Sequence, residues 1–159
     1  MSDRSLRKHL ISALQGGDAH NPLDASIRDF PASLAGARVG ENPHTPWRLL
    51  EHMRIAQWDI LEYCWNPDHV SPQFPDGYWP SSDTPPSSRA WKESVDAFCS
   101  DLAAMRGLVE DPESDLFTPI RHGEKQTLLH EAMNLAIHNA YHLGQLMFIR
   151  RGVATESVV

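Results

Sequence analysis

The chain has 159 residues, of which 41% are apolar and 22% are charged, and its formal net charge is −7. This length suffices for one compact domain with its own core, so we expect a single domain over residues 1–159. The acidic balance argues against a nucleic-acid or membrane-surface binder, because both need concentrated positive charge. The sequence has no apolar run of about 18 residues and no secretory signal at its start, so we expect a cytoplasmic protein.

Helical periodicity appears first in residues 3–15, with Gly16–Gly17 as the stop. The face that this helix is expected to bury consists of Leu6, Leu10, Ala13 and Leu14. A polar connection over residues 18–44 follows, with a short helical turn around residues 25–34. The second helix is predicted to begin at Thr45–Pro46, an N-cap followed by proline, and to end at Asn66–Pro67. Its expected inward residues are Leu49, Met53, Ala56, Ile60 and Tyr63.

Six of the 12 prolines lie between Trp65 and Ser88, which predicts one long ordered loop of the kind that forms lids or walls. The side chains expected to hold this loop on the domain are those of Trp65, Phe74, Tyr78 and Trp79. The third helix should be capped by Ser87 or Ser88 and closed by Pro112. Its apolar residues alternate in steps of four and three, as in helix bundles: Trp91, Val95, Phe98, Leu102 and Met105.

The fourth helix is expected to start between Glu124 and Thr127 and to continue to Arg151, with Gly152 as its stop. Its apolar stripe consists of Leu128, Leu135, Leu146 and Ile149. No segment shows the alternation of a β-strand. Four amphipathic helices in one domain therefore predict an all-α fold, a four-helix bundle with long connections.

Three histidines fall on the inward faces of these helices. His138 and His142 are four residues apart, so both imidazoles project from one side of the fourth helix. His52 lies beside the inward positions of the second helix and should face them. Three imidazoles are typical ligands of a divalent transition metal and leave a position for water or substrate. The alternative is that each is a core histidine with a hydrogen-bond partner, because HxxxH alone is a weak signal.

Several other polar residues lie near this motif. His130-Glu131 resembles the start of the zinc-protease pattern HExxH, but Asn134 replaces its second histidine. Glu131 is a candidate carboxylate behind the metal ligands, although an acid serving the helix dipole is the more ordinary reading. Gln145 is a candidate for orienting a ligand, and Tyr141 is expected to pack against a neighbouring helix.

Roles at the mouth of the site are open for His20 and His44, whereas the residues interpreted as surface histidines are His9, His69 and His122. Cys64 and Cys99 should pack as small apolar residues.

The motif combination resembles the DinB-like (YfiT-like) family of small bacterial four-helix-bundle metalloproteins. The resemblance lies in the run from Trp47 to His52 and in the run His138-Asn139-Ala140-Tyr141-His142-Leu143-Gly144-Gln145-Leu146. It implies a metal site at His52, His138 and His142, a divalent ion such as nickel or zinc, and a homodimer. Related proteins include transferases and isomerases that use a low-molecular-weight thiol as co-substrate.

Three hypotheses follow. The first is a metal-dependent enzyme, a thiol transferase or a hydrolase acting on a small molecule, in which the ion activates the thiol or water. The sequence identifies no general base, and Glu131 and His130 are its only candidates. The second is a non-catalytic bundle that binds a metal or a small molecule. The third is a bundle with three hydrogen-bonded core histidines and no metal.

Overall fold

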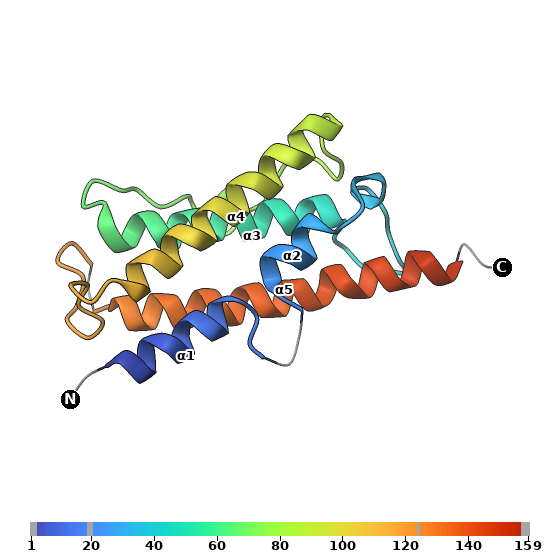
Figure 1. Ribbon diagram of the computed structural model, residues 1–159. Helices are drawn as coiled ribbons and strands as arrows, with labels where there is room; N and C mark the ends of the chain where they lie inside the picture. The colour runs from blue at the N-terminus through green and yellow to red at the C-terminus, as the bar shows by residue number, and fades with distance from the viewer. Residues whose placement is uncertain (1–2, 19–20, 124, 157–159) are drawn as a thin grey trace.

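The computed structural model describes residues 3–18, 21–123 and 125–156, and this part of the chain is helical (Figure 1). Its helices are α1 (Arg4–Leu14), α2 (Leu23–Arg28), α3 (Pro46–Trp65), α4 (Ser88–Glu110) and α5 (Leu128–Glu156), with short 3-10 turns η1 (Ala32–Leu34) and η2 (Asp76–Tyr78). No β-strand forms within these ranges, and an isolated bridge pairs Pro119 with Thr127. The prediction of an all-α fold is confirmed.

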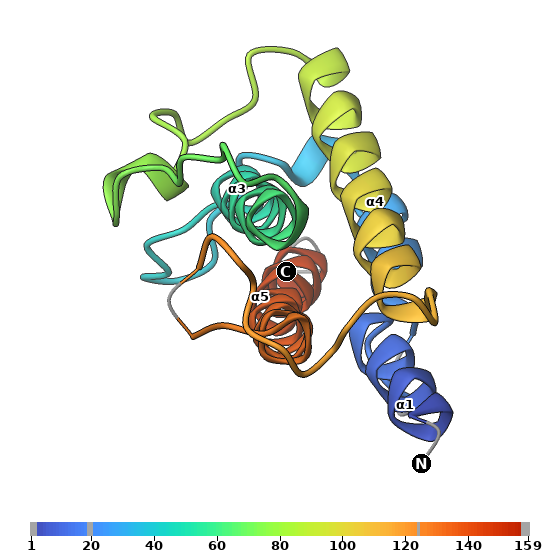
Figure 2. The same ribbon diagram turned by 90° about the vertical axis from the view of Figure 1, so that its left-hand side faces the viewer.

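Helix α3 packs against both α4 and α5 (Figure 2). Helices α1 and α2 each contact α4 and α5. The largest fully buried side chains of α3, α4 and α5 are Leu49, Leu50, Met53, Phe98, Leu102, Met105, Leu135, Leu146 and Ile149. Burial of this apolar surface is the main stabilising contribution to the fold. Among the described helices, none combines the length and the apolar character required to cross a bilayer.

The predicted helix starts are confirmed by their capping hydrogen bonds. Thr45 Oγ1 accepts from the backbone N–H of Arg48 at 3.3 Å, and Ser87 Oγ accepts from that of Ala90 at 3.1 Å. Such caps satisfy N–H groups that have no partner within the helix. They fix the residue at which α3 and α4 each begin. The starting residue in turn affects which side chains of each helix face the core.

The predicted end of the last helix is wrong, because α5 continues through Gly152 to Glu156. Glycine is required there for a different reason: a Cβ atom at this position would lie 2.6 Å from Cγ1 of Val39. The connection between η1 and α3 thus packs directly against the backbone of α5. The helical turn expected around residues 25–34 is likewise two separate elements, α2 and η1.

Four side chains lie elsewhere than expected. Ala13 is exposed, and Tyr141 is 65% exposed instead of packing against another helix. In the loop between α3 and α4, Trp65 and Phe74 are 58% and 83% exposed. This loop lies largely on the side of α3 opposite α4 (Figure 2). It contacts α3 through η2, and its later part bonds to the start of α3, where Thr45 donates to the Asp83 carbonyl and Trp47 donates to Ser82 Oγ. Proline spacing indicates a loop but not which of its aromatic residues turns inward.

A chain of buried hydrogen bonds joins α3, α4 and α5. The Gln57 side chain is fully buried; its Nε2 donates to the Phe98 carbonyl at 2.6 Å, and its Oε1 accepts from Asn139 Nδ2 at 2.9 Å. Buried polar groups without partners are costly, so these bonds favour one register between the three helices. Since Asn139 follows His138 in α5, the chain also fixes the height and rotation of the histidine motif.

We expect Gln57→Leu to destabilise the protein by about 2–4 kcal/mol, because it removes the bond to the Phe98 carbonyl and leaves the Asn139 amide buried without the partner of its Nδ2. Urea unfolding followed by circular dichroism measures this change. Gln73→Leu, an exposed position in the loop, is the matched control and should change stability by less than about 0.5 kcal/mol. Equal stabilities for Gln57→Leu and the control would contradict the role assigned to Gln57.

Candidate metal centre

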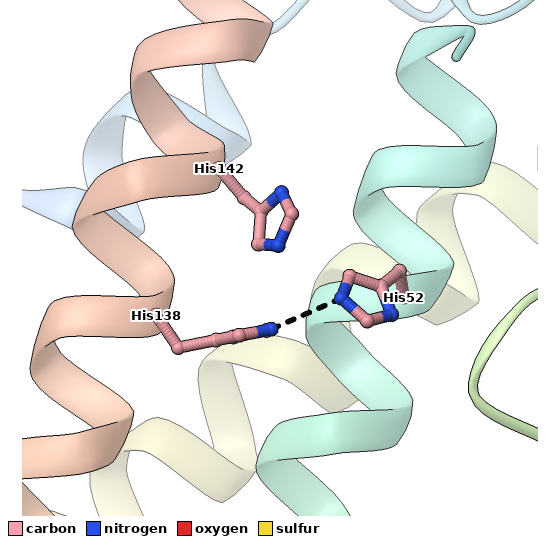
Figure 3. A group of neighbouring side chains, drawn as sticks. All are labelled: His52, His138 and His142. Atoms are coloured by element: carbon pink, nitrogen blue, oxygen red, sulfur yellow. Dashed lines mark hydrogen bonds between the residues drawn. The ribbon is translucent and has the colours of Figure 1, made fainter. Parts of the chain in front are cut away.

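The structure brings the three predicted histidines together between α3 and α5. His138 and His142 lie one turn apart on α5, and His52 faces them from α3 (Figure 3). One nitrogen from each ring lies within 4.8 Å of the others. Residues 86 positions apart in sequence are thus close enough to bind one ion.

The spacing of two of these nitrogens fits a shared metal ion. Nε2 of His138 lies 3.0 Å from Nε2 of His52, as the dashed line in Figure 3 marks. Two imidazole nitrogens that each bind one ion at about 2.0–2.1 Å lie about 3 Å apart when their bond angle is near 90–100°. His52 and His138 would therefore need only small adjustments to bind one ion together.

Two of the rings are oriented through their other nitrogen. Nδ1–H of His52 donates to the backbone carbonyl of Tyr78 at 2.9 Å, and Nδ1–H of His142 donates to Oε1 of Gln145 at 2.7 Å. Because these oxygens only accept, the proton of each neutral ring is on Nδ1 and the Nε2 lone pair is available to the centre. Gln145 thus orients a candidate ligand, the role considered for it from the sequence.

The third ring differs, since Nδ1 of His138 is buried and has no hydrogen-bond partner among the described residues. A buried polar atom without a partner is uncommon and is often found at functional sites. The Nε2 atom of the same ring points into the cluster, 3.0 Å from Nε2 of His52. The His138 imidazole is therefore favourably placed if the cluster binds a cation, and unfavourably placed if it is an ordinary core residue.

Burial lowers the pKa of all three histidines. For His138, burial and the neighbouring His142 and His52 lower the pKa to about 4. The rings are therefore neutral at pH 7, which is the form that binds metal ions. Protons would compete weakly with a metal at this cluster.

An aromatic stack covers the His52 ring. Trp79 lies parallel to it, with ring centroids 3.9 Å apart and planes inclined by 1°. His44 stacks on Trp79, with centroids 4.4 Å apart, and the Arg48 guanidinium lies 5.7 Å from the Trp79 ring centroid. His44 therefore borders the site, as considered from the sequence, whereas His20 lies outside the described residues.

A cavity of about 350 Å³ adjoins the cluster. The residues that line it are His52, Ala56, Asp59, Ile60, Phe74, Tyr78, Asn134, His138 and His142. The loop between α3 and α4 contributes Phe74 and Tyr78, so it forms part of the wall, as expected. A larger hollow of about 720 Å³ beside α1 contains no histidine, so we place the candidate site at the smaller cavity.

The two candidates for a general base lie away from this cavity. Glu131 is a buried acid in the first turn of α5, where burial raises its pKa, and His130 is exposed. Neither residue lines the cavity. Their position in α5 supports the helix-start reading of Glu131 and gives His130 no contact with the cluster.

The sequence reasoning missed a hydrogen-bonded group next to the histidines. Asp59 Oδ2 accepts from the Tyr78 hydroxyl at 2.6 Å, and Asp59 Oδ1 accepts from His69 Nε2 at 2.7 Å. Burial and the bond to Asp59 raise the pKa of Tyr78 to about 12, so its hydroxyl stays protonated. The expectation of a surface His69 is wrong, because its side chain is only 4% exposed. The spacing of seven between His52 and Asp59 indicates a shared face of α3, but nothing in the sequence pairs Asp59 with a loop.

Comparisons with known proteins assign the chain to no group. No protein-family model, no curated protein and no solved structure matches it. We therefore infer its function from the chemistry of the described residues.

Burial of neutral His138 should make the metal-free protein less stable in acid. The unfolded residue has a pKa near 6.5 and the folded one about 4, so the unfolded chain binds more protons as the pH falls below 6.5. Between pH 7 and pH 5, we expect the free energy of unfolding to fall by about 2 kcal/mol more in the wild type than in His138→Gln. Urea unfolding of chelator-treated protein at pH 7 and pH 5 measures it. The exposed His9→Gln should keep the wild-type pH dependence, and the same dependence in His138→Gln would refute the assignment.

Proposed function

We propose that this protein is a metal-dependent enzyme whose divalent ion is bound by His52, His138 and His142. The observation that carries the proposal is the convergence of three neutral imidazoles beside a cavity. The hydrogen bonds on His52 and His142 support it, because they leave Nε2 of each ring available as a ligand. Three imidazoles suit borderline ions, and we propose nickel or zinc.

The number of ligands favours catalysis over a purely structural ion. Within the described part of the chain, the cluster contains three histidines and no cysteine, aspartate or glutamate as a fourth member. Structural zinc sites generally have four protein ligands, whereas catalytic sites keep one position open. A bound ion of this kind lowers the pKa of a thiol or water and so supplies a nucleophile at neutral pH. We propose a thiol-dependent transferase or a hydrolase of a small molecule.

The chain's own residues would define the rest of such a site. Ile60 and Phe74 give the cavity an apolar wall, and Asp59, Tyr78 and Asn134 add polar groups to it. Trp79 covers one face of His52. A small molecule in this cavity would lie between α3, α5 and the loop, in contact with the histidine cluster.

The family assignment belongs to the same proposal. We propose a DinB-like four-helix bundle made of α1, α3, α4 and α5, with α2 as an additional short helix. The support is the helix order, the histidines on α3 and α5, and the long connections before and after α3. The cytoplasmic location expected from the sequence is part of this proposal.

Metal content tests the proposal directly. Protein produced without a tag and reconstituted with zinc or nickel should contain about one equivalent by elemental analysis. His52→Ala should lose the ion, because two ligands on α5 alone bind weakly. His122→Ala, which removes an exposed histidine, is the control and should retain it. A wild-type protein that binds neither metal would refute the enzyme proposal.

The metal-free protein separates an enzyme from a protein that needs its metal to fold. We expect His142→Ala to lose metal binding and keep its helical content, because His142 is not part of the apolar core that holds the helices together. Far-ultraviolet circular dichroism and elemental analysis of the same sample measure both properties. Unfolding of the metal-free protein under mild conditions would favour the non-catalytic alternative, in which the ion is structural.

An exposed apolar face of α5 supports the proposed homodimer. It consists of Met133, Ile137, Tyr141 and Phe148, which are between 49% and 67% exposed. We expect light scattering to give twice the chain mass for the wild type and the single chain mass for Ile137→Asp, because a charge on this face would have to be buried in the dimer. A wild-type protein with the mass of one chain would contradict the dimer.

A further inference from the structure

The residues around the end of η2 make three contacts with the same side of α3. The Tyr78 backbone carbonyl accepts from Nδ1–H of His52 at 2.9 Å. The Trp79 ring stacks on the His52 ring at 3.9 Å. The Tyr78 hydroxyl donates to Asp59 at 2.6 Å, two helical turns further along α3. Tyr78 therefore lies along α3, bound at both ends, with the small Ala56 between the two attachment points.

Asp59 also receives the beginning of the same loop. His69 lies four residues after the end of α3, and its Nε2–H donates to the second oxygen of Asp59 at 2.7 Å. Both side chains are well covered, with 4% of His69 and 12% of Asp59 exposed. One carboxylate thus attaches two separate parts of the loop to α3. Hydrogen bonds to a charged, shielded carboxylate are stronger than those between neutral groups.

The attachment to Asp59 lies close to the contact with His52. After Trp79, the loop is bound to the start of α3 at Ser82 and Asp83, whereas before η2 the Phe74 side chain is largely exposed. A backbone carbonyl orients an imidazole only if the backbone itself is held in place. The Tyr78–Asp59 bond is the side-chain contact nearest in sequence to that carbonyl, because both groups belong to Tyr78.

We propose that Asp59 is a positioning residue of the histidine centre. Through Tyr78, and with His69 as a second attachment, it holds the loop on α3 so that the Tyr78 carbonyl keeps His52 in the Nδ1–H form. Nε2 of His52 is then directed at His138 and His142. This inference rests on the proposed metal site, but its effect on the tautomer of His52 does not require a metal.

The experiment compares Tyr78→Phe and Asp59→Asn with the wild type. Zinc affinity is measured on the full-length protein by competition with a chromophoric chelator. We expect a 10- to 100-fold weaker affinity in both variants, as is typical when a group that orients a metal ligand is removed. Tyr78→Phe keeps the carbonyl and the aromatic ring and removes only the hydroxyl, so it isolates the bond to Asp59. Tyr63→Phe is the matched control, because it removes the hydroxyl that donates to Gln126 at 3.0 Å, and it should bind zinc as the wild type does.

A second measurement on the metal-free protein separates positioning from general stability. Nitrogen-15 NMR of the imidazoles distinguishes Nδ1–H from Nε2–H. We expect the Nδ1–H form of His52 in the wild type and in Tyr63→Phe, and a mixture of both forms in Tyr78→Phe. Helical content should be unchanged in these variants, whereas a merely structural role would reduce it and leave the tautomer of the folded molecules as it was.

The outcomes are distinct. Unchanged zinc affinity together with an unchanged His52 tautomer in Tyr78→Phe would overturn the inference. A wild-type protein that binds no zinc would refute the proposed metal site, and the NMR measurement would then decide the inference by itself. If Asp59→Asn does not fold, Tyr78→Phe carries the test alone.

Discussion

The contact between α3 and α5 is the constraint on which the candidate site depends. Gln57 and Asn139 bond to each other inside the protein, and Gln57 also bonds to the Phe98 carbonyl of α4. Sliding or rotating one helix would leave these amides buried without partners, at a cost of about 1–3 kcal/mol for each group. These hydrogen bonds specify one relative position of the helices, which apolar contacts alone do not. Because His138 adjoins Asn139, the bonds that set the helix register also set the position of the cluster.

Burying three imidazoles in this contact opposes stability unless they bind something. Their charged forms are disfavoured, as the lowered pKa values show, and one buried nitrogen has no partner within the described residues. Two hydrogen bonds, from His52 and His142, compensate part of this cost. The apolar core carries the fold, so the protein tolerates a site that is better suited to binding than to packing. Binding of a cation to the neutral imidazoles would offset the part of this cost that the two hydrogen bonds leave.

The loop between α3 and α4 completes the site from outside the helix pairs. It supplies a carbonyl and a tryptophan ring to His52, and it supplies Phe74 and Tyr78 to the wall of the cavity. Asp59 connects this loop to the helix that carries His52. The candidate centre therefore combines two rigid helices, which set the spacing of the ligands, with a loop whose attachment sets the orientation of one of them.

Periodicity and capping chemistry in the sequence were enough to determine the helical class, the starts of α3 and α4, and the histidines that meet. Apolar steps of three and four reveal which side of each helix is buried, and His52, His138 and His142 lie on those sides. The end of α5 was not determined, because Gly152 is there for the close approach of Val39 and does not stop the helix. Nor did the sequence indicate the pairing of Asp59 with Tyr78 and His69, or which aromatic residues of the loop turn inward. Those contacts join a helix to an irregular segment without periodicity, so only the tertiary structure decided them.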